Sequence, residues 1–81
     1  MSIVTTPDGK KFYSAHPQGF LSADQCSTYC IQSGDTLAVI ADKLKVKPIP
    51  GMTNWQRLAG VNGIANANVI KPDIYLWVPR D

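Results

Sequence analysis

The most constraining feature of the sequence is a stretch, residues 29–44, that combines the patterns of a strand, a glycine turn and a helix. Tyr29 and Ile31 are two residues apart, so they face the same side of a strand. The next apolar residues recur at steps of three and four and form one helical stripe: Leu37, Ile40, Ala41 and Leu44. Gly34 allows the chain to reverse, and we expect Asp35 to cap the helix, a contribution of about 1 kcal/mol. The two apolar faces can therefore meet across the turn.

A second helix and a second strand follow in the C-terminal half. We expect the first helix to end near Lys45, before an irregular connection, 46–51, that contains two prolines. Thr53 and Gln56 have the spacing of a capping box, which predicts a helix start there. Asparagine and glycine residues predict a loop over 62–68. The last strand alternates between two faces, with Ile74, Leu76 and Val78 on one and Tyr75 and Trp77 on the other.

The N-terminal residues contain one clear signal, a hairpin turn. The sequence Thr-Pro-Asp-Gly-Lys at 6–10 lies between two short β-prone runs, 3–5 and 11–13. Proline, aspartate and glycine each favour a turn there, so we expect a small hairpin. An isolated hairpin is marginal in water, so Phe12 or Tyr13 should pack on the domain or on a partner. We expect the following residues to form an ordered arm, with room for one helical turn from Ser22 to Cys26.

Length and composition exclude several classes of function. A chain of 81 residues is one domain at most and buries about 60 to 65% of its unfolded surface. The net charge of +2 is too small to indicate a nucleic-acid partner. No segment approaches the roughly 20 apolar residues of a membrane span, and the first residues do not resemble a secretory signal. We therefore expect a protein that is made in the cytoplasm, and the docking hypothesis described below adds association with a virion or a similar particle.

The residue types of catalytic and metal sites do not gather in a recognisable pattern. His16 is the only histidine, and no serine or cysteine beside it suggests a triad. Asp35 and Asp73 lack any predicted apolar pocket that raises one pKa, as glycoside hydrolysis requires. Cys26 and Cys30 do not have zinc-site spacing, and an extended strand between them forbids a disulfide. We expect no enzyme, no metal and no cofactor.

In this order and spacing the segments resemble the LysM module. The residues that carry the resemblance are Tyr29-Cys30-Ile31, Gly34-Asp35-Thr36-Leu37, Ile40-Ala41, Trp55-Gln56-Arg57-Leu58, Asn62-Gly63-Ile64, and Ile70-Lys71-Pro72 with Leu76, Val78 and Pro79. The resemblance implies an α+β fold, with a βααβ LysM domain over 29–80 and an N-terminal extension over 1–28 that holds the hairpin and arm. It also implies noncatalytic binding of an N-acetylglucosamine-containing glycan such as peptidoglycan.

In the LysM family, ligand contacts come from two neighbouring loops. Carried over by position, the glycan-binding residues are Gly34, Asp35, Thr36, Leu37, Asn62, Gly63, Ile64, Asn66, Asn68 and Ile70. An acetamido group offers an N–H, a C=O and a methyl, which a shallow groove can match with backbone polar groups beside Leu or Ile. A purely structural interpretation stays open, in which Asp35 caps a helix, Leu37 lies in the core and Asn62 bonds the loop backbone.

The sequence departs from the LysM pattern in two places. The connection after Val46 is longer than usual, and Pro72-Asp73-Ile74 stands where the family usually has Pro-Gly-Gln. Aspartate tolerates a turn nearly as well as glycine, so we expect the fold to survive. Tyr75 and Trp77 either offer a stacking platform for a sugar ring or cover the aromatic residues of the N-terminal arm, and we favour the cover.

A second hypothesis is a structural docking adaptor of a phage tail, baseplate or contractile injection assembly. Its contacts with neighbouring protein subunits would use the N-terminal arm and the Tyr75/Trp77 face. A single shallow sugar site binds weakly, and this chain has no repeated module to provide avidity. One copy per subunit of a larger particle would restore that avidity, so the two hypotheses are compatible.

Overall fold

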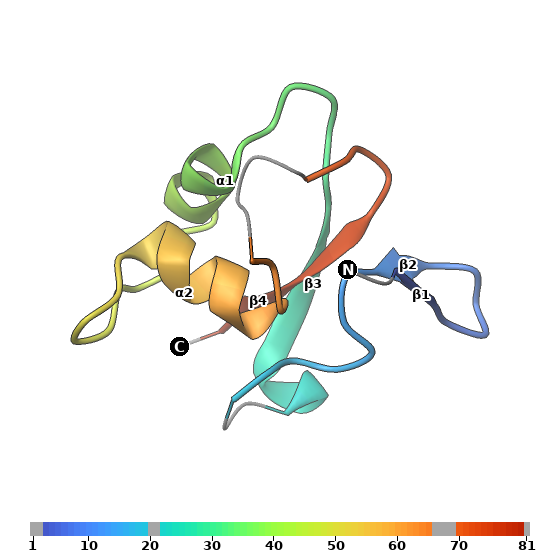
Figure 1. Ribbon diagram of the computed structural model, residues 1–81, viewed down its shortest axis with the longest axis horizontal. Coiled ribbons are helices and arrows are strands. Elements are labelled where there is room, and N and C mark those ends of the chain that lie inside the picture. The colour runs from blue at the N-terminus through green and yellow to red at the C-terminus, as the bar shows by residue number, and fades with distance from the viewer. Residues whose placement is uncertain (1–2, 20–21, 66–69, 81) are drawn as a thin grey trace.

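The computed structural model describes residues 3–19, 22–65 and 70–80, which form an α+β fold (Figure 1). The elements follow in the order β1 (Val4–Thr5), β2 (Lys11–Phe12), the 3-10 turn η1 (Ala23–Gln25), β3 (Cys26–Cys30), α1 (Leu37–Lys43), α2 (Asn54–Val61) and β4 (Tyr75–Pro79). The order β3-α1-α2-β4 confirms the predicted βααβ arrangement. The strands β1 and β2 confirm the predicted N-terminal hairpin and join the same sheet.

Strands β3 and β4 pair antiparallel in a four-stranded sheet of order β1-β2-β4-β3. Tyr29 lies opposite Leu76. Beyond the strands, Ile31 N donates to Ile74 O and Asp73 N donates to Ile31 O, both at 2.9 Å. The pairing on which the predicted fold depends is therefore confirmed, and it continues into the loops at one end of the sheet.

Thr36, rather than Asp35, caps helix α1. The Thr36 hydroxyl accepts a hydrogen bond from Val39 N at 3.2 Å. The predicted capping role of Asp35 is wrong because the helix begins at Leu37, which leaves Asp35 one position outside the N-cap. The helix ends close to the predicted Lys45, whose φ of 56° turns the chain away from the helix axis.

Helix α2 begins where its capping-box spacing predicts. Thr53 N donates to Gln56 Oε1 at 2.9 Å and so finds a partner in the first turn. The connection before it contains a tight turn, in which Ile49 and Met52 exchange two backbone hydrogen bonds of 3.2 and 3.0 Å. Proline at the first central position of this turn and Gly51, with φ of 86°, at the second match a type II turn.

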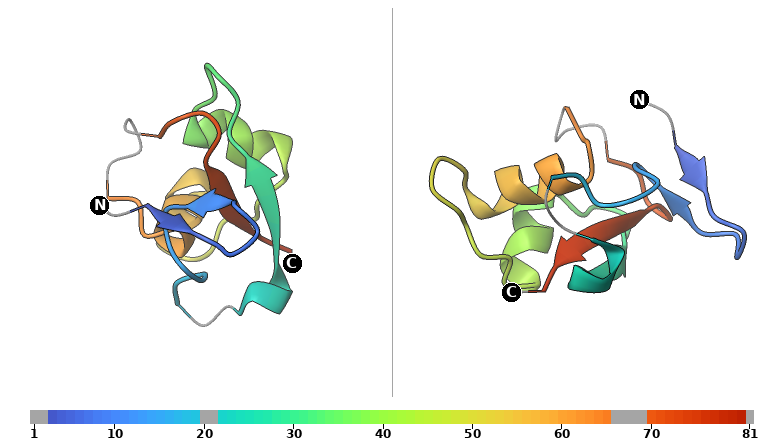
Figure 2. Two further views of the ribbon diagram at one scale, coloured as in Figure 1. Left: turned by 90° about the vertical axis from the view of Figure 1, so that its right-hand side faces the viewer. Right: turned by 90° about the horizontal axis from the view of Figure 1, so that it is seen from below.

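The core lies between the two helices and one face of the β3–β4 pair (Figures 1 and 2). Its largest fully buried apolar side chains are Ile31, Leu37, Ile40, Leu58 and Leu76. The predicted helical stripe is buried, apart from Leu44, which packs at the core's margin. The alternation of β4 is also confirmed, because Ile74, Leu76 and Val78 are buried whereas Tyr75 and Trp77 are half-buried on the opposite face.

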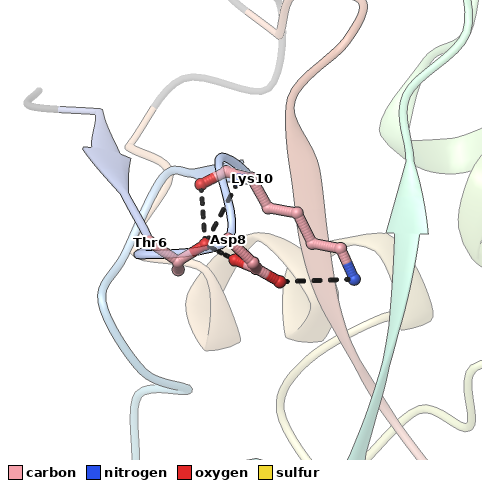
Figure 3. A network of polar contacts seen from close by, with 3 residues as sticks. All are labelled: Thr6, Asp8 and Lys10. Carbon is pink, nitrogen blue, oxygen red and sulfur yellow. Dashed lines mark hydrogen bonds and ion pairs between the residues drawn. The ribbon is translucent and has the colours of Figure 1, made fainter.

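The hairpin turn at residues 6–10 is held by polar contacts of the predicted turn residues (Figure 3). The Thr6 hydroxyl accepts a hydrogen bond from Lys10 N at 3.2 Å and donates to the Asp8 carboxylate. Lys10 Nζ lies 3.9 Å from Asp8 Oδ2, and Gly9 adopts a φ of 88°. The turn thus satisfies its own polar groups. The expected helical turn of the arm is η1.

The arm packs on its own domain. Phe12 pairs with Tyr75 in a parallel register, and its ring stacks on Trp77 with 4.5 Å between ring centroids. The Trp77 indole N–H donates to Ser14 O at 3.0 Å. The favoured interpretation of the Tyr75/Trp77 face, a cover for the arm, is confirmed. The alternative, a stacking platform for a sugar ring, loses the part of this face on which the Phe12 ring lies.

Candidate functional site

The two loops that the sequence singled out lie side by side at one end of the sheet. The first, residues 32–36, joins β3 to α1, and the second, residues 62–74, joins α2 to β4. The two hydrogen bonds between Ile31 and the 73–74 backbone link the bases of these loops. The ribbon views in Figures 1 and 2 place the first loop next to the segment that leads into β4.

The first loop is shaped by Asp35. Its Oδ2 accepts hydrogen bonds from the Tyr29 hydroxyl at 2.7 Å and from Gln32 N at 2.9 Å, while Asp35 N donates to Gln32 O at 3.1 Å. Gly34, with φ of 88°, provides the left-handed residue that closes this turn. Asp35 therefore orders the loop and links it to β3, while the neighbouring residue Thr36 caps helix α1.

Lys43 completes this network from the end of helix α1. Its Nζ donates to the Tyr29 hydroxyl at 2.7 Å and lies 4.8 Å from the centroid of the Tyr29 ring. The hydrogen bond from the Tyr29 hydroxyl, followed by the one from Gln32 N, lowers the pKa of Asp35, and Lys43 adds a smaller effect in the same direction. The bond to Tyr29 likewise raises the pKa of Lys43. The network joins β3, the first loop and α1.

The first loop is expected to loosen only in strong acid. Because folding lowers the pKa of Asp35 below its ordinary value of 3.8, its contribution is complete above that value and is lost as the pH falls through the folded pKa. An NMR titration should show the Asp35 carboxyl carbon and the Gln32 amide changing together below pH 3.8. In Tyr29→Phe the midpoint should move upward, because the largest cause of the shift is removed. A wild-type midpoint at or above 3.8 would contradict this network.

The predicted contact residues divide between surface and core. Gly34, Thr36 and Gly63 are exposed and Asp35 is half-buried. Leu37 and Ile64 are buried at 1% and 6% exposure, and Ile70 packs partly buried against the same core cluster. Asn66 and Asn68 lie outside the described residues. The described part of the site is therefore a polar, glycine-containing rim over an apolar base.

Asn62 performs a structural task inside the fold. Its side chain is 0% exposed. The amide donates to Leu58 O at 2.8 Å and to Trp77 O at 2.9 Å, and its oxygen accepts from Trp77 N at 2.6 Å. These bonds link the end of α2 to the middle of β4, so the side chain has no surface to offer a ligand. We had favoured a hydrogen bond from Asn62 to the backbone of its own loop. Its partner is instead Trp77 on β4, 15 residues later in the chain.

Two residues of the arm border the second loop and were not predicted to do so. Gln18 N donates to Val61 O at 2.8 Å, and its side chain lies beside Gly63, where an added Cβ would be 3.9 Å from Gln18 Cγ. The Tyr13 hydroxyl accepts a hydrogen bond from Lys71 N at 2.7 Å. The only sequence signal was the general need to bury the aromatic residues of the arm.

Other kinds of site were considered over residues 3–19, 22–65 and 70–80. Within these ranges no group of three or more His, Cys, Asp or Glu side chains comes together to hold a metal ion. Cys26 and Cys30 are not joined by a disulfide, as their positions on one strand predict. None of the described helices is both long and apolar enough to cross a membrane.

Comparison with known proteins identifies the fold as that of a known family. The family model described as "LysM domain" matches residues 29–79, which is more than half of the chain. Neither the curated proteins nor the solved structures gave a significant match. The matched segment contains β4, both helices, both loops of the candidate site and the end of β3. The chain therefore belongs to the LysM family.

Proposed function

We propose that the two loops bind an N-acetylglucosamine-containing glycan, with peptidoglycan as the ligand, and that the domain is noncatalytic. LysM domains are generally noncatalytic modules that bind peptidoglycan or chitin. The observation that carries the proposal is the linkage of the two loops at their bases through Ile31, which holds two exposed rims beside each other over an apolar base.

The chemistry of these rims suits an uncharged sugar. Gly34 and Gly63 are exposed and carry no side chain, so a ligand can approach the backbone of both rims closely. Gly63 N already donates to Gly60 O at 3.2 Å, but other backbone groups of the rims can pair with the N–H and C=O of an acetamido group. Ile70 belongs to the second loop, is half-buried against the core cluster, and offers an apolar surface for the acetamido methyl. Such a groove needs no charge, and the carboxylate of Asp35 is already engaged with Tyr29 and Gln32.

Charged substitutions on the two rims are expected to abolish retention on insoluble peptidoglycan. Thr36→Asp keeps a capping oxygen for α1 but places a charge beside a neutral sugar. Ala65→Asp places the same charge on the second loop, at an exposed position. We expect at least a tenfold loss of bound protein for each variant in a pull-down assay. Ile64 is unsuitable for this test because it is buried and a charge there would disrupt the core.

Ala23→Asp provides the matched control. Ala23 is exposed and lies before the start of β3, so the length of that strand separates it from the first loop. The same charge at this position should leave retention unchanged. Equal retention of the wild type and both rim variants would contradict the proposed glycan site. A wild type that is retained neither as a single chain nor in many copies would contradict it as well.

We further propose that the domain acts as one of several copies carried by a larger particle, such as a phage tail or an injection assembly. The matched segment contains one module, and one shallow sugar site binds weakly unless several sites act together. The expected result is that chains displayed in many copies on beads bind peptidoglycan at least a hundredfold more tightly than the single chain. If a single chain binds equally well, avidity is not needed. A docking adaptor without glycan binding is the alternative, supported by wild-type protein that shows no retention in either format.

A further inference from the structure

A hollow of about 400 Å³ runs along the outer side of helix α2 and reaches the second loop of the glycan site. Its lining residues are Gly51, Met52, Trp55, Gln56, Ala59, Gly60, Ile64 and Ala65. Ile64 and Ala65 belong to the second loop, while Met52 belongs to the turn that precedes the helix. An eight-residue helix spans about 12 Å, so the hollow extends well beyond the loops themselves.

The lining combines an aromatic surface with unused hydrogen-bond donors. Trp55 is half-buried against the core, and its indole N–H has no partner among the described residues. Gln56 uses its oxygen to accept from Thr53 N, which leaves its NH2 group without a partner there. No buried side-chain N or O atom among the described residues lacks a hydrogen bond, so the Trp55 indole N–H reaches solvent. Gln56 is itself exposed.

Gly60 lines the hollow without placing a side chain in it. A glycine inside a helix costs about 1 kcal/mol relative to alanine, yet a Cβ here would make only an ordinary contact, 3.4 Å from Met52 Cε. Packing therefore does not require glycine at this position. A longer side chain at residue 60 would enter the hollow between Met52 and Gln56. A Cβ there already lies 3.4 Å from Met52 Cε, and Gln56, four residues earlier, shares its helix face.

We propose that this hollow is a second saccharide subsite, which binds units of the glycan chain that continue past the two loops. The inference rests on the proposed glycan function, because the ligand there is a polymer. An aromatic surface with adjacent aliphatic groups suits the apolar face of a sugar ring. The two unused donors suit its hydroxyl and acetamido oxygens, which accept hydrogen bonds. None of the described residues that line the hollow is charged, in keeping with an uncharged ligand.

Calorimetric titration of the full chain with short and long N-acetylglucosamine oligomers tests the subsite. The wild type should bind the hexamer at least fivefold more tightly than the trimer. Gly60→Gln should reduce the hexamer affinity to that of the trimer without changing trimer binding, because glutamine fills the hollow and favours the helix. Gly60→Ala is the matched control and should keep the difference, since a single methyl leaves the space open. In NMR spectra the Trp55 indole N–H should shift only with the hexamer, while that of Trp77, bonded to Ser14 O, should not.

The outcomes separate the subsite from the glycan site itself. If the trimer binds but the hexamer gains nothing, or if Gly60→Gln retains the gain, the subsite is wrong and the loop site stands. If neither oligomer binds the wild type, both proposals are overturned. A length dependence that Gly60→Gln removes and Gly60→Ala keeps supports the subsite.

Discussion

Asn62→Ala is expected to lower the free energy of unfolding by about 2 to 4 kcal/mol, because it leaves two backbone groups of β4 without partners inside the protein. The lost bonds are those that Asn62 makes with the N–H and C=O of Trp77. The third bond, to Leu58 O, is replaceable, since Asn62 N also donates to that oxygen at 3.3 Å. A domain of this length has about 4 to 12 kcal/mol of stability in total. The variant should therefore be partly unfolded at moderate temperature.

Urea denaturation followed by circular dichroism measures this effect, and Asn54→Ala is the control. Asn54 also uses its side-chain amide, donating to Asp42 Oδ1 at 2.6 Å and accepting from Trp55 N at 2.7 Å, but it is only half-buried. Water can replace these partners, so the loss should lower the free energy of unfolding by no more than about 1 kcal/mol. If the two alanine variants are equally stable, the buried amide does not hold α2 to β4, and the second loop must be positioned by other contacts.

The helical stripe could be predicted from the sequence, whereas the hydrogen-bond partner of Asn62 could not. The stripe from Leu37 and the alternation from Ile74 are local patterns, since burial on one face repeats with the period of the element itself. Those patterns were sufficient for the order of strands and helices. The partner of Asn62 is Trp77 on strand β4. The alternating pattern predicts that strand but not which of its residues lies opposite the Asn62 amide, so this contact could not be predicted before the fold was known.

In the candidate site, the sequence also did not determine which of two adjacent residues caps helix α1. Asp35 and Thr36 are both good capping residues, and a shift of one residue in the helix start decides which of them caps. Asp35 then bonds Tyr29, and this depends on the turn that brings β3 back to α1. Element boundaries are set by such competition between neighbouring residues. The sequence thus located the first loop correctly but assigned its carboxylate to the wrong backbone group.

Contacts between the arm and the domain were the hardest to anticipate, because they join segments far apart in the chain. Gln18 and Tyr13 approach the second loop through an arm with no periodic pattern. Composition indicated only that aromatic residues needed cover. Asp73, by contrast, was correctly expected to support the turn before β4, and it does so with φ of 67°.

Phe12→Ala is expected to lower the free energy of unfolding by about 3 to 4 kcal/mol and to release the hairpin from the sheet. Phe12 is 3% exposed, and its ring packs against both aromatic side chains of β4, Tyr75 and Trp77. The backbone pairing is short, since β2 meets β4 at the single pair Phe12 and Tyr75. A hairpin whose strands are two residues long has little stability of its own, so it should open once this ring is removed.

Hydrogen exchange of the Thr6 amide reports this release directly, because Thr6 N donates to Lys10 O at 2.8 Å only when the hairpin is formed. Exchange should accelerate at least tenfold in Phe12→Ala. Lys11→Ala is the control, since Lys11 lies on the same strand but is exposed, and it should leave both stability and exchange unchanged. Tyr13 and Gln18 hold the later part of the arm through their own bonds to Lys71 and Val61. Protection of Thr6 that survives in Phe12→Ala would mean that these bonds also hold the hairpin and that the aromatic stack is dispensable.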